Sequence, residues 1–369
     1  MKMRRSRLAA FFPLITLAAG FPELSASAQT PLGLSLQINS GATELTITGA
    51  AGATCQIQWT DNLSVTSHWS HLEHAVLSGQ DYLLTDSTVP ATSRYYRAVW
   101  TPNTNLVWIP PGVFTQGSPT NELHRSSIEG PQMTVTISRG FWMGKYEVTQ
   151  GDYVAVMGTN PSYYNGDRSG PPDNDQDYGV DLSRPVEMVT WFDATNYCAK
   201  LTAQERAAGR IPTNSTYRLP TESEWEYACR AGTTTRFYYG DDLDYTNLFQ
   251  YAWYYDTSDL QTHSVGQLLP NAWGLYDMAG NVWEWTTDWY QEHSQIPHSC
   301  CASFNPKGGD REQSYDPQFP AVRIPRKVIK GGSFLCSANY CRRYRPAARF
   351  PEPIDSSTSN IGFRCIVRP

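Results

Sequence analysis

The sequence predicts an α+β fold with little regular secondary structure, preceded by a small all-β sandwich domain. Three observations support this. Short alternating segments fill the first hundred residues, three capped helical patterns follow, and the C-terminal part has few long periodic runs. The chain contains 27 Gly, 25 Pro, 22 Tyr and 12 Trp. Such a composition indicates a loop-rich fold whose irregular backbone is held by large aromatic rings.

The N-terminus is expected to be a secretory signal peptide spanning residues 1–28. Basic residues (Lys2, Arg4, Arg5 and Arg7) precede an apolar run that ends at Phe21, and Ala26-Ser27-Ala28 follows as a cleavage site. The run is too short for a membrane span and contains Pro13, and no other stretch is apolar enough, so we expect no transmembrane segment. The protein is therefore expected to be exported, either to a periplasm or out of the cell.

Charge limits the class of partner. The net charge is -6 over 369 residues, with a sequence pI of about 5.7. Binding to phosphate backbones leaves a basic footprint, and none is visible, so a nucleic-acid partner is not expected. Eight cysteines in an exported chain make disulfides possible, although an even count does not fix their pairing.

Residues 30–101 are expected to form the small β-sandwich. The segments LSLQIN, ELTITG, CQIQWT, YLLTD and RYYRAVW alternate in strand fashion and are separated by turn-forming residues. His68, His71 and His74 recur at three-residue spacing in this part. Because no carboxylate or Cys cluster accompanies them, they are predicted to be polar loop residues around Trp69 and not metal ligands.

A second domain is expected over residues 105–369, after the linker TPNTN. Thr149 and Gly158 bound one helical pattern, and VTWFDATNYCAKLTAQERAAG forms a longer one. A third pattern starts at Thr221, three residues before Glu224, which is the spacing of a capping box, and closes near Gly232. The rest is predicted to be loops and short strands.

The stretch GGSFLCSANYC, residues 331–341, is the strongest chemical signal in the chain. Cys336 and Cys341 lie in one Gly- and Asn-punctuated segment. Two converging thiolates suit soft Cu(I) better than hard ions. The alternatives are an ordinary structural disulfide, which an oxidising compartment favours, and a redox-labile pair.

Four stretches, LPTESEWEYACRAG, NAWGLYDMAGNVWEWTTDWY, VIKGGSFLCSANYCRRYRPAARF and SSTSNIGFRC, occur in an order that resembles the formylglycine-generating enzyme (sulfatase-modifying factor) family. The resemblance covers roughly Asn105 to Pro369. It implies a formylglycine-generating-enzyme fold, which is similar to that of C-type lectins. Many proteins with this fold lack the catalytic thiols, so membership alone does not give the activity.

Because both cysteines are present, the resemblance implies a copper-dependent oxidase. Such an enzyme uses O2 and a thiol reductant to convert a cysteine in a sulfatase-type Cys-X-Pro-X-Arg motif to Cα-formylglycine. Cys336 and Cys341 would bind Cu(I), and Ser333 would lie beside the oxygen-binding position. The partner would be a sulfatase polypeptide.

The resemblance also implies a substrate groove shaped by Tyr340, Arg342 and Asn360. Guanidinium and amide groups can hydrogen-bond an extended peptide backbone. Each of the three is equally compatible with a surface residue that closes its own loop.

A calcium site is expected in YDMAGNVWEW. Asp277 and Glu284 are hard oxygen ligands, and with the carbonyls of Gly280 and Val282 they could wrap Ca2+ in an irregular loop. The resemblance points to the same four positions, in a structural role. The family's other calcium loop would fall near YAWYYDTSD, where Trp253 stands in place of the expected Asn.

The resemblance pairs Cys198 with Cys365 as a disulfide, which would tie the C-terminus to the body of the domain. Cys229 departs from the pattern, because Pro346 occupies its expected partner position. The pairing of Cys55, Cys229, Cys300 and Cys301 stays open.

Two other functions remain in view. A non-catalytic, exported lectin-like binding module of the same fold would carry Cys336 and Cys341 as a disulfide. An iron-dependent sulfoxide synthase would need a helical domain with a histidine triad, and the N-terminal pattern is that of β-strands.

Overall fold

The computed structural model describes residues 33–39, 42–49, 51, 53–60, 70–78, 80–86, 94–101, 105–166, 179–293 and 302–368. The predicted signal peptide, His68, Trp69, Cys300 and Cys301 lie outside the described residues. No helix among the described residues is long and apolar enough to cross a membrane.

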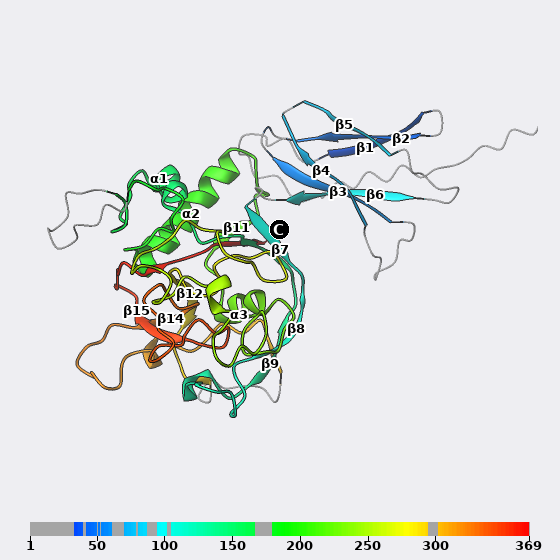
Figure 1. Ribbon diagram of the computed structural model, residues 1–369. Coiled ribbons are helices and arrows are strands. Elements are labelled where there is room, and N and C mark those ends of the chain that lie inside the picture. The colour runs from blue at the N-terminus through cyan, green and yellow to red at the C-terminus, as the bar shows by residue number, and fades with distance from the viewer. Residues whose placement is uncertain are drawn as a thin grey trace, which may run out of the picture.

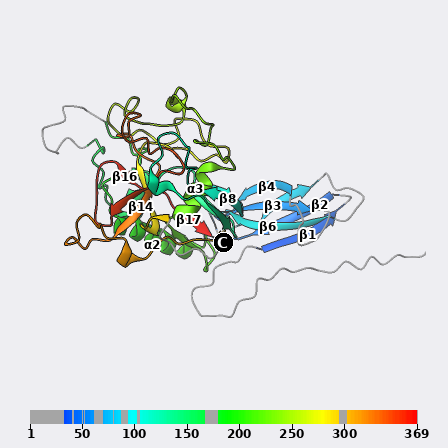
Figure 2. The same cartoon turned by 90° about the horizontal axis from the view of Figure 1, so that it is seen from below.

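Six strands occupy the predicted β region. They are β1 (Gly33–Asn39), β2 (Ala42–Thr48), β3 (Thr54–Thr60), β4 (Ser70–Val76), β5 (Tyr82–Asp86) and β6 (Tyr95–Thr101). Two three-stranded antiparallel sheets result, in the orders β1-β2-β5 and β4-β3-β6 (Figure 1, Figure 2). The alternating apolar residues of these strands, Leu45, Ile47, Cys55, Ile57 and Ala75 among them, form a buried cluster of their own. Independence of this part as a domain stays a prediction.

The loop prediction for the histidines is wrong for the two that can be described. His71 and His74 lie in β4, where they pair in register with Gln58 and Gln56 of β3. The polar composition of this segment favours a loop, but pairing with β3 makes it a strand. Strand preference depends strongly on such pairing.

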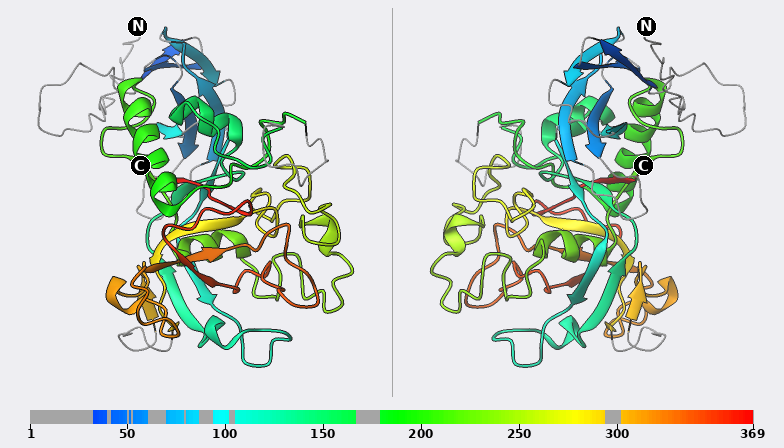
Figure 3. Two further views of the ribbon diagram at one scale, coloured as in Figure 1. Left: turned by 90° about the vertical axis from the view of Figure 1, so that its left-hand side faces the viewer. Right: turned by 90° about the vertical axis from the view of Figure 1, so that its right-hand side faces the viewer.

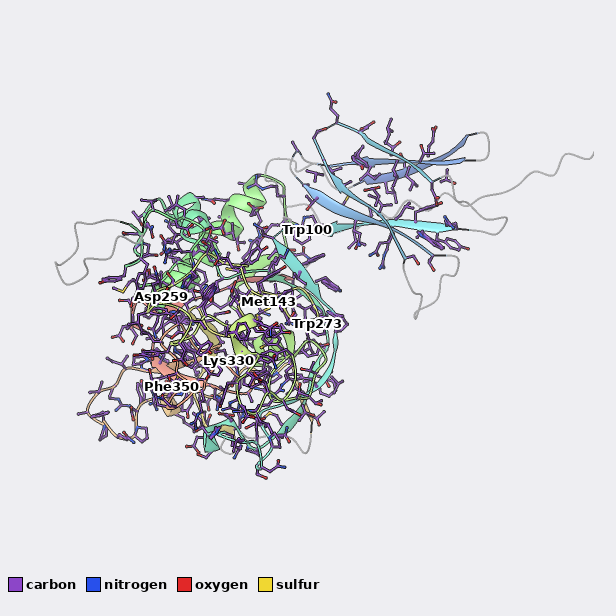
Figure 4. All side chains as sticks on the ribbon, in the orientation of Figure 1. Trp100, Met143, Asp259, Trp273, Lys330 and Phe350 are labelled. Atoms are coloured by element: carbon purple, nitrogen blue, oxygen red, sulfur yellow. The ribbon has the colours of Figure 1, made fainter. Side chains whose placement is uncertain are left out.

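Trp100 connects the N-terminal strands to the larger part of the molecule. It lies near the end of β6 and packs partly buried against the main hydrophobic core, and its indole N–H donates to the carbonyl of Arg210. Figure 4 shows Trp100 at the junction of the two parts. One large ring thus supplies both an apolar and a polar contact across the junction.

The three predicted helices are confirmed. They are α1 (Gln150–Met157), α2 (Trp191–Ala207) and α3 (Glu222–Arg230). Each begins with a threonine whose hydroxyl accepts from the backbone three residues on, in a reciprocal capping box with Asp152, Asp193 and Glu224 respectively. Gly158 ends α1 in the left-handed conformation, and Ala231 takes that role after α3.

Eleven short strands build the sheets of the larger part. They are β7 (Leu106–Ile109), β8 (Gly112–Gln116), β9 (Met133–Ile137), β10 (Phe141–Gly144), β11 (Thr216–Arg218), β12 (Trp283–Trp289), β13 (Ala302–Phe304), β14 (Arg326–Lys330), β15 (Phe350–Pro353), β16 (Ile361–Gly362) and β17 (Ile366–Arg368). The three sheets have the orders β11-β17-β10-β7, β15-β14-β12-β16 and β13-β9-β8. The C-terminal strand β17 therefore lies between β10 and β11. Figure 3 shows the C-terminus on the side of the larger part that faces the N-terminal strands. The expectation of short strands and loops is confirmed.

Helix α3 contacts β8, β12 and β14 and is buried along its whole length. Its polar residues need partners for that reason: Glu226 pairs with Arg230 and with Lys330 of β14. The segment after Lys330 leaves this rigid layer and carries both candidate thiols.

Candidate active site

Two glycines start the thiol loop, which we define as residues 331–341. Gly331 and Gly332 have φ of 93° and 74°, a region that other residues rarely adopt. A Cβ on Gly332 would lie 3.0 Å from the backbone nitrogen of Tyr344. Glycine is therefore required for the loop to fold back closely on its own end.

Backbone hydrogen bonds hold both cysteines. The Cys336 N–H donates to Ser333 at 2.9 Å, the Cys336 carbonyl accepts from Tyr255 at 2.9 Å, and the Cys341 N–H donates to Ser337 at 3.1 Å. Cys336 is buried, Cys341 is half-buried, and both are free thiols. The loop thus presents one inner and one outer thiol.

The two side chains affect each other's ionisation. A hydrogen bond between the thiols, together with burial, raises the pKa of Cys336. The same hydrogen bond lowers the pKa of Cys341 to about 7, against the effect of its partial burial and with help from Arg343. Cys341 is therefore the thiol that carries the negative charge, with Cys336 as its donor.

Ser333 and Asn360 meet beside the thiols. Ser333 is fully buried, and its Oγ accepts from Nδ2 of Asn360 at 3.2 Å. Asn360 is fixed in turn by Thr358, whose hydroxyl donates to Oδ1, and by the N–H of Trp283, which donates to its backbone carbonyl. Two residues singled out from the sequence are thereby brought into contact.

Tyr340 and Arg342 take different directions. Tyr340 is exposed, and its hydroxyl donates to the carbonyl of Leu335 at 2.6 Å. Arg342 donates to Ala338, and its Nη1 lies 2.6 Å from Nδ1 of His124. Tyr340 therefore folds back on its own thiol loop, whereas the guanidinium of Arg342, one residue after that loop, contacts the segment between β8 and β9.

Arg343 was not singled out in the sequence. It hydrogen-bonds the Cys341 sulfur, and its guanidinium stacks 4.2 Å from the ring centroid of Phe350. The sequence offers two consecutive arginines at this place. Without the backbone path, it does not indicate which of them contacts the cysteines.

The expected calcium loop has tightly fixed ends. Asp277 has a φ of 55°, and its carboxylate accepts from the Gly266 N–H at 2.7 Å. Both oxygens of Glu284 accept from Arg364, at 2.7 Å each, and one also accepts from the Trp225 indole at 2.7 Å. The Gly280 N–H donates to the carbonyl of Gly331, so this loop touches the start of the thiol loop.

Glu147 is a third buried carboxylate at this place, and sequence reasoning missed it. It accepts from the side-chain amide of Asn281 at 2.8 Å and from the N–H of Val282 at 3.1 Å. Burial, Asp277 and Glu284 raise its pKa. Three buried carboxyl groups face one buried guanidinium, Arg364, and a cation bound there would favour their ionised forms.

No group of three or more His, Cys, Asp or Glu in the described ranges has the geometry of a metal site. The calcium fit therefore rests on Asp277 and on backbone carbonyls, with Glu284 already engaged by Arg364. This is compatible with Ca2+, which takes carbonyl as well as carboxylate oxygens.

The departure at Trp253 has a visible structural result. Its ring stacks on His263 with centroids 3.8 Å apart, and Nε2 of His263 lies 2.8 Å from the Ser258 carbonyl. A stacked aromatic pair fills the place where an oxygen ligand was expected, so the residues present do not fit a second calcium ion there.

The Cys198 and Cys365 sulfurs lie 3.3 Å apart, both buried and not covalently joined. Cys198 lies in α2, whereas Cys365 directly precedes β17 and is not part of it. Cys229 and Cys55 are buried free thiols whose pKa values burial raises, to about 11 for Cys55.

Comparison with known proteins decides the family. Residues 94–369 match the sulfatase-modifying factor enzyme 1-like domain. The chain belongs to this family. The match begins within the segment that leads into β6, ahead of the expected boundary at residue 105.

Relatives in this family differ in what their names state. The chain is 32% identical to the formylglycine-generating enzyme of Mus musculus over 309 residues, which is 71% of this chain and 74% of the relative. It is also 32% identical over 196 residues to a protein from the same organism named inactive C-alpha-formylglycine-generating enzyme 2, covering 50% of this chain and 49% of that one.

Among solved structures, PvdO from Pseudomonas aeruginosa superposes with a TM-score of 0.56 at 27% identity, covering 72% of this chain and 94% of PvdO. The family fold is therefore shown, and the chemistry has to be argued from the site.

Proposed function

We propose that the protein is an exported, copper-dependent formylglycine-generating oxidase acting on a cysteine in a sulfatase-type Cys-X-Pro-X-Arg segment. The observation that carries the proposal is the thiol loop, where two free cysteines meet beside a buried serine. Identity of about a third to named formylglycine-generating enzymes supports it.

Cys336 and Cys341 would hold the copper ion. Two sulfur donors on one loop match the preference of Cu(I) for soft ligands and low coordination numbers. When bound, Cu(I) supplies a soft centre for the substrate thiolate and a one-electron couple for O2 chemistry. The partial exposure of Cys341 leaves a side from which a third sulfur can approach.

The chain's own residues would position the substrate and exclude water. Ser333 is buried and its hydroxyl lies against Asn360, so it can hydrogen-bond a reduced oxygen species without competition from bulk water. Arg343 balances the negative charge of the sulfur pair. Tyr340 and Arg342 would border the peptide path, as expected from the sequence.

The overall reaction balances with two reductant thiols. One peptidyl –CH2–SH, one O2 and two thiols give one aldehyde, one hydrogen sulfide, one disulfide and one water. O2 is reduced by four electrons, of which two come from the substrate carbon and two from the reductant.

The loop of Asp277, Gly280, Val282 and Glu284 would bind a structural Ca2+. The support is the group of buried carboxyl groups Glu147, Asp277 and Glu284, which face a single guanidinium, Arg364. A disulfide between Cys198 and Cys365 would be a second structural element, supported by the closeness of their sulfurs.

Export through a cleaved N-terminal signal over residues 1–28, and a β-sandwich domain over residues 30–101, are part of the proposal. The signal peptide is supported by the order of basic, apolar and small residues at the N-terminus. The β-sandwich is supported by the two sheets β1-β2-β5 and β4-β3-β6.

A non-catalytic binding module is the second candidate. The family contains relatives without the activity by name, such as the inactive mouse protein. In that case Cys336 and Cys341 would be joined as a stable disulfide.

The test is mass spectrometry of a synthetic Cys-X-Pro-X-Arg peptide incubated with the mature protein, Cu(I), O2 and a thiol reductant. Loss of the Cys side chain in favour of an aldehyde is expected only when copper is present. Cys229→Ser is the matched control variant, because it removes a buried thiol outside the loop and should leave turnover unchanged. An unchanged peptide, with Cys336 and Cys341 joined and resistant to reduction, would support the binding module instead.

A further inference from the structure

An exposed histidine, His124, contacts the end of the thiol loop from a distant part of the chain. It lies in the segment between β8 and β9, residues 117–132, which we call the arm. Nδ1 of His124 is 2.6 Å from Nη1 of Arg342. Arg342 also donates to the Ala338 carbonyl, and in the part of the chain that the structure describes it forms no ion pair with a carboxylate. His124 therefore fixes the outer end of this guanidinium.

The chemistry of the two side chains decides the protonation state of His124. A guanidinium has five N–H donors and no acceptor, and it does not lose its proton in proteins. Nδ1 of His124 must therefore be the acceptor, so the ring is neutral and carries its proton on Nε2. A proton on Nδ1 would replace this hydrogen bond by a contact between two donors, both of them positively charged.

Both residues of this contact have an uncommon backbone conformation. The φ angle is 64° at His124 and 52° at Arg342. Few residues other than glycine adopt such values, and they persist only where the surrounding structure holds them, although His and Asn tolerate them better than most. Loss of the contact would therefore leave both segments free to relax.

Positive charge surrounds the imidazole of His124. Arg342 and Arg345 approach it from the segment after the thiol loop. Arg236 approaches from the loop after α3, where the Tyr245 ring stacks on His124 with centroids 6.4 Å apart. Loss of hydration and the three guanidinium groups lower the pKa of His124. A second positive charge at this place is unfavourable.

The acidic groups of the arm do not offset this charge, because they are already paired. Glu129 is buried, and both its oxygens accept from Arg345, at 2.5 and 2.8 Å. Glu122 also pairs with Arg345. Arg125, the other charged residue of the arm, adds positive charge next to His124. The Arg345 pairs hold the base of the arm whether or not His124 is protonated.

We propose that His124 is a pH-sensitive switch between the arm and the end of the thiol loop. In its neutral form it accepts from Arg342 and holds the tip of the arm, residues 121–126. In its protonated form it loses this hydrogen bond, is repelled by the guanidinium groups, and releases both the tip and Arg342. Because Glu129 stays paired with Arg345, the opening is local. The contact is closed at pH 8 and open at pH 5. This inference does not depend on the oxidase activity.

The first measurement is the pKa of the His124 imidazole, followed by NMR of its ring C–H signals in the mature, metal-free protein. It should lie below 6.5, the ordinary value for histidine. Arg342→Gln keeps a donor without the charge and should raise this pKa by about half a pH unit or more. The pKa of His263, which contacts the Ser258 carbonyl instead, should not change. Equal values for His124 in the wild type and in Arg342→Gln would overturn the switch.

The second measurement compares hydrogen exchange of peptides that cover residues 121–126 in the wild type and in His124→Asn, at the same pH. Asn tolerates a positive φ and places Oδ1 close to the position of Nδ1, but it cannot be protonated. The two proteins should exchange alike at pH 8. At pH 5 the wild type should exchange about threefold faster or more, because only its arm opens. Strand β9, residues 133–137, should exchange alike in both proteins at both pH values.

Each other outcome contradicts the switch. Equal, slow exchange of the tip at pH 5 would show that the arm does not open. Equal acceleration in both proteins would assign the opening to a different titrating group. If His124→Asn lowers the thermal midpoint, Arg342→Gln gives the second comparison, since its tip should exchange fast already at pH 8. A slow tip in that variant would overturn the switch. Neither measurement involves copper or a peptide substrate, so failure of the switch and failure of the oxidase are seen separately.

Discussion

The protein brings two pairs of cysteines together, and the two pairs differ in their surroundings. Cys198 and Cys365 meet between helix α2 and the start of β17, both buried. Cys336 and Cys341 meet within one loop, where Cys341 is half-buried and Arg343 contacts its sulfur. Close approach of two thiols is thus not enough to identify a reactive site. The burial and the neighbours of the pair distinguish a reactive site from a structural element.

Burial gives the difference a physical form. In the reduced protein, burial raises the pKa of Cys365, which keeps that thiol protonated and inert toward ions and electrophiles. Cys341 has a lowered pKa and a path to solvent. A bound ion or substrate can therefore reach only the second pair.

The largest expected effect is on activity, which should depend on one cysteine pair and not on the other. Cys336→Ser or Cys341→Ser should lower aldehyde formation by about 10³-fold or more, because the two thiols act as a unit. The thermal midpoint should change little, since the loop is held by backbone hydrogen bonds that serine retains. Mass spectrometry of the peptide and calorimetry give the two readouts. Cys365→Ala should keep its turnover, and equal losses for both pairs would contradict the distinction between them.

The second effect concerns stability. Cys198→Ala or Cys365→Ala should lower the free energy of unfolding by about 2–4 kcal/mol, because the proposed disulfide closes a long loop. Denaturant titration measures it, and alanine avoids burying a hydroxyl. Dithiothreitol should cause the same loss in wild type and none further in the variants. A wild type equally stable with and without reductant would exclude the bond.

The third prediction asks which pair depends on the calcium loop. The Gly280 N–H donates to Gly331, so removal of Ca2+ should loosen the thiol loop and leave Cys198 and Cys365 unaffected. The free energy of unfolding in EGTA should be about 1–3 kcal/mol lower than at saturating calcium. Asp277→Asn should abolish this response, and Asp244→Asn should keep it. Labelling of Cys336 by a thiol reagent should become faster with EGTA. An unchanged rate would show that calcium binding does not stabilise the thiol loop.

The smallest effect sharpens the comparison by pH. With a pKa of about 7, Cys341 should be mostly thiol at pH 6 and mostly thiolate at pH 8 in the reduced, metal-free protein. Its alkylation by iodoacetamide should therefore rise about tenfold across this interval, with the midpoint near pH 7. Cys365 and Cys229 should stay unlabelled at both values, because burial holds them as thiols. Peptide mapping after quenching measures each cysteine. A midpoint above pH 8 for Cys341 would show that the hydrogen bond from Cys336 is absent in solution.

Much of the local structure followed from local chemistry. Thr149, Thr190 and Thr221 cap their helices because a hydroxyl and an acidic residue three positions on satisfy orphan N–H groups within one turn. The pattern is complete within four residues, so no tertiary contact is needed to recognise it. Gly331 and Gly332 differ from the caps, because the contacts that require glycine there come from Trp225 and Tyr344, outside the local segment.

Predictions that depended on partners from elsewhere in the chain were less complete. β4 was missed because its ladder partner β3 decides its conformation. Glu147 was missed because its partners Asn281 and Val282 lie more than 130 positions later in the chain. Arg343 is only two residues from Cys341, but spacing alone does not distinguish it from Arg342. Arg342 was predicted from the resemblance to border the substrate groove, and this stays a prediction. Its contact with His124, 218 positions earlier in the chain, could not be read from the sequence.

By itself, the sequence determined the helices, the thiol loop with its two cysteines and the family, because these depend on residues close together or on motifs in a fixed order. Only the tertiary structure decided that Asn360 holds Ser333, that Arg364 engages Glu284, and that Trp253 and His263 stack where a ligand was expected. The physical reason is the same in each case. Burial removes water as a partner, and the group that replaces it comes from whichever segment the fold places within hydrogen-bond or van der Waals distance.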